Sequence, residues 1–294
     1  MMSDNYRKVK RVLWAILFAN LAVAILKIVM GAAIKSTGLL ADGFHSLTDG
    51  SSNIVGLIGI WFASKPVDKD HPYGHTKFEI LAGLIIAGML FFACGKIATN
   101  AVEKLRNPVA PNLSPLSFSV MLLTMIINIF VSVFERNAGK KLDSLVLISD
   151  SMHTRSDIYV TIGILAILIG IKLGLPPIID PIASFIVCGI IFWAAYKIFK
   201  DNSDILLDKA VVDTDKIKRI AFSFEQVKDA HDIRSRGTEN DLYIDMHIMT
   251  EPCMSVEESH ELIHLIEDKI REEINQNVQV IAHIEPYTGN GNSH

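Results

Sequence analysis

Two histidine–aspartate pairs with the same spacing lie inside apolar segments of the sequence. His45 and Asp49 are four residues apart, and His153 and Asp157 repeat this spacing further along the chain. Residues four apart share one face of an α-helix and lie about 6 Å apart along its axis. Two such helices packed face to face bring together two imidazoles and two carboxylates, a ligand set that suits tetrahedral zinc. We therefore predict one metal site formed by His45, Asp49, His153 and Asp157.

Ionisable side chains inside an apolar segment are costly and are functional candidates by default. The alternative is that these residues only join helices through hydrogen bonds. Two matched pairs at matching depth favour the metal site over that alternative. Asp42, Asp150 and Arg155 lie off the two ligand faces, and we expect structural or supporting roles for them.

A second group of metal-binding residue types lies in the loop at 68–75, DKDHPYGH. Asp68, His71 and His75 have the spacing to share one cation. A loop histidine is usually only a solvated side chain, so the position of this loop at the cytoplasmic mouth of the apolar segments is what supports a site.

A third group lies in the last part of the chain. His231 and His247 fall on two predicted strands, and His283 and Glu285 share one face of a third. His260 and His264 fall on a predicted helix between them. Of the ten histidines only His294 lies outside the apolar segments, the loop and this group, and such concentration favours divalent metal over chance. The candidate ligands in this group are His231, Asp232, His247, His260, His264, His283 and Glu285.

Long apolar segments must position the first of these groups. Six of them run roughly over 12–34, 38–63, 78–101, 113–134, 144–171 and 178–198. Each is near or above the ~20 residues that a helix needs to cross a bilayer. Half of the 294 residues are hydrophobic, 20% are charged, and the chain has a formal net charge of −4. This composition predicts a membrane protein in a lipid bilayer and gives no basis for a nucleic-acid surface.

Lysine and arginine are unequally distributed between the two sets of connections. The richer set includes the N-terminus and the chain after the sixth segment, so both termini are expected in the cytoplasm of a multi-pass protein of the inner (plasma) membrane. No cleavable secretory signal is expected, because the first apolar run is too long. The three cysteines form neither a CxxC pair nor a disulfide framework.

From about Asp204 the sequence becomes charged and water-compatible. It predicts a helix from Asp213, strands at 229–237 and 242–249, a helix opened by a capping box at Ser255 and Glu258, and a strand at 278–284. We therefore predict two domains, a six-span transport domain at 1–203 and a small α+β domain with αββαβ order at 204–294.

The stretches LLADGFHSLTDGSSN, DHPYGHTKFE and SDSMHTRSD, with six apolar segments and a histidine-bearing tail, closely resemble the cation diffusion facilitator family of metal–proton antiporters. The resemblance covers almost the whole chain. It implies a homodimer whose ferredoxin-like, metallochaperone-like cytoplasmic domain binds metal and dimerises. It also implies the same transport and loop sites, and it implies that the tail sites lie among His231, His247, His260, His283 and Glu285. His45 stands where some members carry Asp, which favours zinc, and Glu285 stands where some members carry Asp.

The predicted function is export of Zn²⁺ from the cytoplasm in exchange for protons, by a transporter and not an enzyme. Fe²⁺, Co²⁺, Ni²⁺ or Mn²⁺ remain alternative substrates, because the mixed nitrogen and oxygen set does not exclude them. A non-transporting metal sensor would need no ligands inside the membrane. An intramembrane zinc hydrolase would need an open coordination position with a general base, and the sequence offers no HExxH motif.

Overall fold

The computed structural model describes residues 2–33, 37–106, 115–172, 174, 176, 178–238 and 241–288. The chain divides into two compact units, Met1–Ser203 and Asp204–His294. Each unit has its own buried core, so each is treated separately below.

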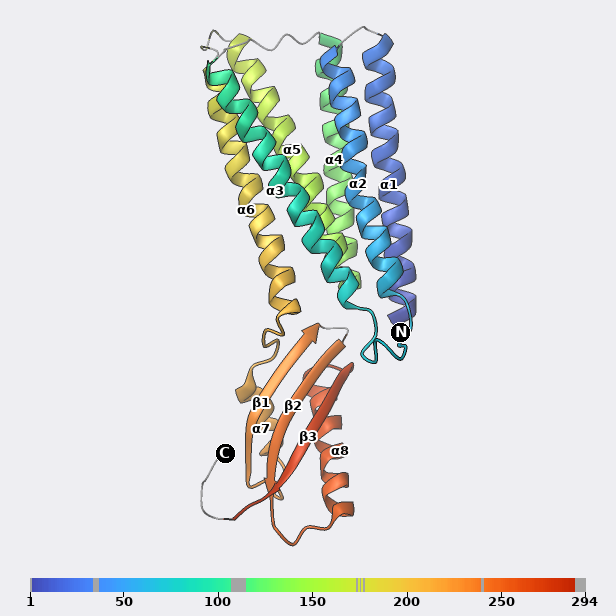
Figure 1. Cartoon of the computed structure of the whole chain (residues 1–294), viewed down its shortest axis with the longest axis vertical. Coiled ribbons are helices and arrows are strands. Elements are labelled where there is room, and N and C mark those ends of the chain that lie inside the picture. Colours follow the sequence, from blue (N-terminus) through green and yellow to red (C-terminus); the bar gives the residue numbers. More distant parts are fainter. Residues whose placement is uncertain are drawn as a thin grey trace. The chain divides into compact units, whose positions relative to one another are not determined.

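The first unit consists of long helices that lie side by side (Figure 1). They are α1 (Met2–Ala33), α2 (Thr37–Ala63), α3 (Lys77–Arg106), α4 (Pro115–Leu142), α5 (Leu145–Lys172) and α6 (Ile179–Leu206). Four stretches within the described residues are long and apolar enough to cross a membrane: Asn5–Met30, Lys77–Glu103, Phe118–Leu142 and Pro181–Leu206. The apolar helix found in α2 is the shorter Gly50–Ala63. The prediction of helices is therefore confirmed, whereas six crossing spans stay a prediction.

The helices are longer than the apolar runs that predicted them. The fourth run ended at 134 and contained no charge, but α4 continues to Leu142. Glu135 therefore lies inside the helix, where it is 0% exposed. A boundary drawn from hydrophobicity stops at the first ionisable residue, although Glu135 stays inside the helix with its Oε2 accepting a hydrogen bond from Thr154 of α5.

Two apolar clusters hold this unit together. One joins α1, α2, α3 and α5 through residues such as Leu13, Ile60, Ile86 and Leu147. The other joins α3 and α6. Gly59 of α2 is needed for the first, because a Cβ at this position would collide with the Cβ of Ala82 on α3. Many other large apolar side chains remain exposed on the outer faces of the helices, as expected for surfaces that face lipid.

The second unit contains α7 (Thr214–Ala221), β1 (Asp229–Thr238), β2 (Asp241–Thr250), α8 (Val256–Glu273) and β3 (Val278–Pro286). This is the predicted αββαβ order. β2 is the central strand, antiparallel to β1 and parallel to β3. The capping box is present, since Ser255 Oγ accepts from the Glu258 N–H and the Glu258 carboxylate accepts from the Ser255 N–H.

Alternation along β2 gives the sheet one covered and one open face. Leu242, Ile244, Met246 and Ile248 are buried against α7 and α8. The residues between them, including His247, point to the other face, because successive side chains of a strand alternate. The helices therefore build the core on one face and leave the opposite face for the histidines.

Candidate metal sites

His153 lies in the buried interior of the membrane unit. Its side chain is 6% exposed, and neither ring nitrogen has a hydrogen-bond partner among the described residues. A buried polar group without a partner is costly. A bound cation would satisfy a ring nitrogen of this buried imidazole, so His153 is suited to be a metal ligand. Asp157 follows one turn later on α5 and is half-buried.

The side chains of His45 and Asp49 lie outside the described residues, although α2 spans both positions. The helical register of α2 against α5 is nevertheless visible on the next turns. Asn53 of α2 is hydrogen-bonded to Asp150 of α5, and Gly56 lies beside Val146. The residue numbers rise on α2 as they fall on α5, so the two helices run antiparallel. One turn further along this register, position 49 of α2 lies level with about position 154 of α5. Two turns further, position 45 lies level with about position 158.

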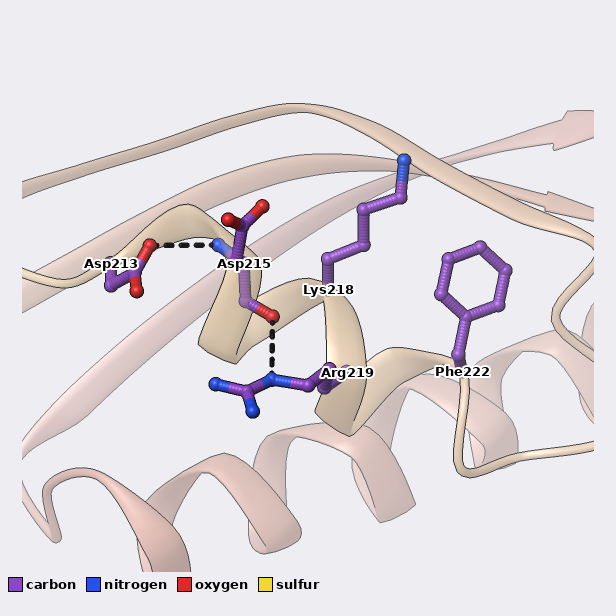
Figure 2. Close-up of a pocket in the computed structure, with 5 residues that line it drawn as sticks. All are labelled: Asp213, Asp215, Lys218, Arg219 and Phe222. Carbon is purple, nitrogen blue, oxygen red and sulfur yellow. Dashed lines mark hydrogen bonds between the residues drawn. The ribbon is translucent and has the colours of Figure 1, made fainter.

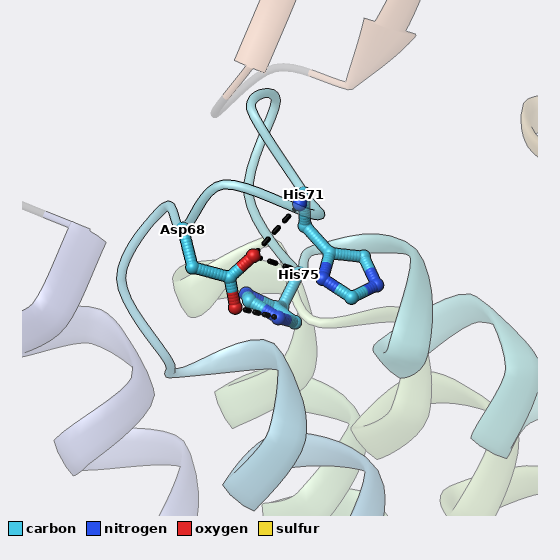
Figure 3. A group of neighbouring side chains, drawn as sticks. All are labelled: Asp68, His71 and His75. Carbon is cyan, nitrogen blue, oxygen red and sulfur yellow. Dashed lines mark hydrogen bonds and ion pairs between the residues drawn. The ribbon is translucent and has the colours of Figure 1, made fainter.

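The loop residues Asp68, His71 and His75 come together as the spacing predicts (Figure 3). His71 Nδ1 lies 3.1 Å from Asp68 Oδ1, and His75 Nε2 lies 3.3 Å from Asp68 Oδ2. The two imidazole rings are 4.3 Å apart, centre to centre. His75 is buried while Asp68 and His71 are exposed, so one side of the cluster is open to solvent and could admit a cation.

The backbone of the loop preorganises the carboxylate of Asp68. Asp68 Oδ1 accepts the N–H of Asp70 at 3.0 Å and the N–H of His71 at 2.7 Å. The hydrogen bond from the His71 backbone lowers the pKa of Asp68 below its usual 3.8. Gly74 has a φ of 83°, a left-handed conformation that glycine adopts without strain. The loop therefore presents an ionised ligand next to two imidazoles.

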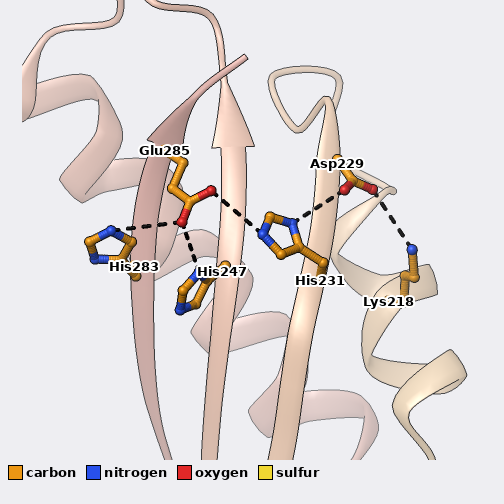
Figure 4. A network of polar contacts seen from close by, with 6 residues as sticks. All are labelled: Lys218, Asp229, His231, His247, His283 and Glu285. Atoms are coloured by element: carbon orange, nitrogen blue, oxygen red, sulfur yellow. Dashed lines mark hydrogen bonds and ion pairs between the residues drawn. The ribbon is translucent and has the colours of Figure 1, made fainter. Parts of the chain in front are cut away.

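In the second unit the sheet register aligns three histidines in one row. His231 of β1 is opposite His247 of β2, and His247 is opposite His283 of β3. Glu285 shares their face, with Oε1 2.8 Å from His247 Nδ1 and Oε2 3.5 Å from His231 Nε2. His283 Nε2 is 3.9 Å from the same carboxylate (Figure 4). His231, His247 and Glu285 are close enough to hold one metal ion.

A β-bulge turns His231 into this row. The pairing of β1 with β2 shifts register between His231 and Arg234, and Asp232 adopts a φ of 47° there. A bulge changes which face the following side chains occupy and re-aims the residues beside it. Asp229 also supports His231, with Oδ2 3.3 Å from His231 Nδ1, and Lys218 lies 3.7 Å from Asp229 (Figure 4). No pattern in the sequence pointed to Lys218 or Asp229.

His260 is not part of the strand row in one chain. It lies on α8, exposed to solvent, with Nε2 3.1 Å from His264 Nε2. α8 packs on the covered face of the sheet, whereas the row occupies the open face. His260 can therefore share the ions of the row only if it approaches from a second copy of the chain.

A pocket beside α7 is lined by Asp213, Asp215, Lys218, Arg219 and Phe222 (Figure 2). Its polar groups serve the helix itself: Asp213 accepts the N–H of Asp215 at 3.1 Å, and Arg219 Nε donates to the Asp215 carbonyl at 3.3 Å. Because these hydrogen bonds lie within α7 itself, we interpret the pocket as the capped end of the helix and not as a binding site.

Comparison with known proteins identifies the class to which this arrangement belongs. A family model described as the cation efflux transmembrane domain matches residues 13–207, and the cytoplasmic domain of cation efflux proteins matches residues 211–287. The protein is thus a membrane cation efflux transporter, with a dimerisation-type cytoplasmic domain. The chain belongs to the cation diffusion facilitator family.

Several relatives align over most of their length. An uncharacterised transporter of Methanocaldococcus jannaschii is 31% identical, with 90% of this chain and 94% of the relative covered. The manganese efflux system protein MneP of Bacillus subtilis is 27% identical over 98% of this chain and 99% of its own. The cadmium, cobalt and zinc/H(+)-K(+) antiporter of Bacillus subtilis is 26% identical over 84% and 80%.

Proposed function

We propose that this protein exports divalent metal cations from the cytoplasm in exchange for protons and that Zn²⁺ is its main substrate. The observation that carries the proposal is His153, a buried imidazole with no partner for either nitrogen among the described residues. The α2–α5 register supports His45, Asp49, His153 and Asp157 as one transport site, since it puts the two pairs at one level. Two imidazoles and two carboxylates form a set that tetrahedral zinc accepts.

Proton exchange follows from the chemistry of the ligands. An imidazole binds metal only in its neutral form, so an entering ion displaces protons from histidine. Protons arriving from the far side compete with the metal for the same nitrogens and release it. Histidine suits both directions because its usual pKa is near neutral pH. Six membrane crossings and cytoplasmic termini belong to the same proposal.

The loop and tail clusters are proposed as additional metal sites on the cytoplasmic side. Asp68, His71 and His75 would receive ions near the entrance. His231, His247, His283 and Glu285 would bind metal in the tail, with His260 supplied by a second subunit of a homodimer. Metal shared between two tails would stabilise the dimer when cytoplasmic metal is abundant.

Mn²⁺ is the second candidate substrate, because a relative aligned over nearly the whole chain is named a manganese efflux protein. The test is uptake of Zn²⁺, Mn²⁺, Co²⁺, Ni²⁺ and Fe²⁺ into sealed vesicles that contain the purified protein and carry a pH gradient. We expect Zn²⁺ to accumulate fastest and a protonophore to stop uphill accumulation. Faster Mn²⁺ uptake would reassign the metal, and uphill uptake without any proton gradient would contradict antiport.

A further inference from the structure

The helix that carries His153 and Asp157 is held at its first turn by an acidic side chain of another helix. Glu79 of α3 is 8% exposed, and its Oε1 accepts a hydrogen bond from Ser144 Oγ at 2.5 Å. The same oxygen accepts the N–H of Val146 at 3.4 Å. Both partners lie at the start of α5, so a residue of α3 forms part of the N-terminal cap of α5.

The first turn of α5 needs such partners because it is buried. The first N–H groups of a helix have no acceptor within the helix, and burying them without one is unfavourable. Ser144, Val146 and Leu147 are at most 2% exposed. The N–H of Leu147 reaches Ser144 Oγ at 3.5 Å, and the N–H of Val146 reaches Glu79. The hydroxyl group of Ser144 therefore serves α5 and binds α3 at the same time.

The same end of α5 is also held close to α4. Two residues, Asp143 and Ser144, separate these helices, and the Ser144 N–H donates to the Gly139 carbonyl of α4 at 2.9 Å. A Cβ at Gly139 would lie 3.1 Å from the backbone nitrogen of Ile148, so the two helices approach closely here. The start of α5 is thus fixed against α4 by the backbone and against α3 by Glu79.

A second contact fixes α5 further along its axis. Asp150 accepts a hydrogen bond from Asn53 of α2, and it lies six residues, or about 9 Å, after Ser144. One contact alone would allow α5 to tilt about it, whereas two separated contacts fix the tilt. A tilt about Asp150 would move His153 and Asp157 relative to α2, since a hydrogen-bonded helix moves as a rod over such short distances.

We propose that Glu79 is a positioning residue whose contact with the start of α5 makes the transport site selective for Zn²⁺ over Mn²⁺. The inference rests on the proposed transport site, in which two ligands come from α5 and two from α2. Zn²⁺ requires nitrogen and oxygen ligands at about 2.0–2.2 Å in a tetrahedron. Mn²⁺ suits an octahedral oxygen set that water can complete. A displaced α5 therefore weakens Zn²⁺ binding more than Mn²⁺ binding.

Uptake from an equimolar mixture of Zn²⁺ and Mn²⁺ into sealed vesicles tests this selectivity. The ratio of the two metals taken up reports discrimination and does not depend on how many molecules are folded, because both ions compete for the same molecules. Glu79→Leu should lower the Zn²⁺/Mn²⁺ ratio by roughly tenfold, the smaller of the losses seen when a group that orients a metal ligand is removed. A role in folding alone would lower both uptakes and leave the ratio unchanged.

Three further variants make the test specific. Glu79→Gln keeps an oxygen that can accept from Ser144 and Val146, so it should keep the wild-type ratio. Ser144→Ala removes the donor at the other end of the contact and should lower the ratio in the same direction, which preserves the test if Glu79→Leu does not fold. Glu103→Leu changes an exposed glutamate of the same helix and is the matched control.

Hydrogen exchange of the full-length protein examines the contact without reference to transport. The amides of Val146 and Leu147 should exchange faster in Glu79→Leu than in the wild type, Glu79→Gln and Glu103→Leu. Unchanged exchange in Glu79→Leu would refute the cap. Wild-type vesicles that transport metal, with an unaltered ratio in Glu79→Leu and Ser144→Ala, would refute the positioning role alone. Wild-type vesicles that take up neither metal would instead refute the proposed function.

Discussion

Asn53 of α2 donates its side-chain amide to Asp150 of α5, and both side chains are fully buried. The same amide accepts a hydrogen bond from Asn20 of α1 at 2.8 Å. One asparagine therefore links three helices and holds the register in which the two histidine–aspartate pairs reach one level.

Replacing Asn53 by leucine should lower both thermal stability and metal transport. The variant leaves the half-buried amide of Asn20 and the buried carboxyl group of Asp150 without this partner, and an unsatisfied buried group costs about 1–3 kcal/mol. Melting in detergent and uptake in vesicles measure the two effects. Thr99→Ala removes a hydroxyl that is exposed on α3 and serves as the control. Full transport by Asn53→Leu would mean that the register does not depend on this amide.

Asp157→Ala or Asp49→Ala should abolish metal uptake and leave a folded dimer. Each variant removes one of four predicted ligands, and neither changes the tail. Uptake in vesicles and size-exclusion chromatography measure these outcomes. Asp70→Ala, which removes an exposed carboxylate from the loop, is the matched control. Wild-type flux in either ligand variant under the same pH gradient would make the assignment of the transport site wrong.

The isolated tail, residues 208–294, should fold alone and melt at higher temperature when Zn²⁺ is added. Its buried cluster joins α7, α8 and the sheet within this unit. A metal that binds only the folded state stabilises it by on the order of 3 kcal/mol at a hundredfold excess over the dissociation constant. For a domain of this size the midpoint should rise by roughly ten degrees or more, and a chelator should reverse the rise.

His247→Ala together with His283→Ala should remove most of that rise, because these residues supply two neighbouring imidazoles of the row. His264→Ala, an exposed residue of α8 outside the row, should keep it. A rise of equal size in the double variant would place the metal elsewhere in the tail.

Acid should weaken the tail partly through Glu258. Its carboxylate accepts the Ser255 N–H at 2.8 Å, and this hydrogen bond lowers the pKa of Glu258 below its usual 4.5. Because the pKa of Glu258 is lower in the folded than in the unfolded state, its ionised carboxylate stabilises the folded tail at pH values above the unfolded-state pKa. This stabilisation is lost as the pH falls through the folded-state pKa. Glu258→Gln should therefore melt lower at neutral pH and show a smaller loss below pH 4.5. The neighbouring Glu257→Gln should follow the wild type in melts across this range.

Mild oxidation should crosslink α3 to α6. Cys94 Sγ lies 2.6 Å from Cys188 Sγ, although both cysteines are free thiols. A membrane-permeant oxidant should join them, and peptide mass spectrometry should detect the 94–188 disulfide. Cys253, exposed in the tail, should not appear in an intrachain pair. Failure to form the crosslink in the folded protein would contradict this packing of α3 against α6.

The sequence predicted every element whose signal is local. Apolar runs longer than a bilayer requires marked the positions of the six long helices, and the Ser255–Glu258 box marked the start of α8. The spacing of His153 and Asp157 placed them one turn apart for the same reason, since a helix repeats every 3.6 residues. The loop triad could also be predicted, because Asp68, His71 and His75 lie within one short turn.

Contacts between distant segments needed the tertiary structure. The row of His231, His247 and His283 depends on strand register and on a bulge at Asp232. The burial of Glu135 beside Thr154 depends on how α4 packs on α5, and hydrophobicity alone had excluded Glu135 from its helix. The free energy of such contacts comes from partners far along the chain, so no local pattern of residues records it. Spacing along the sequence therefore determined which ligands could share a helix or a loop, while packing decided which side chains from distant segments meet.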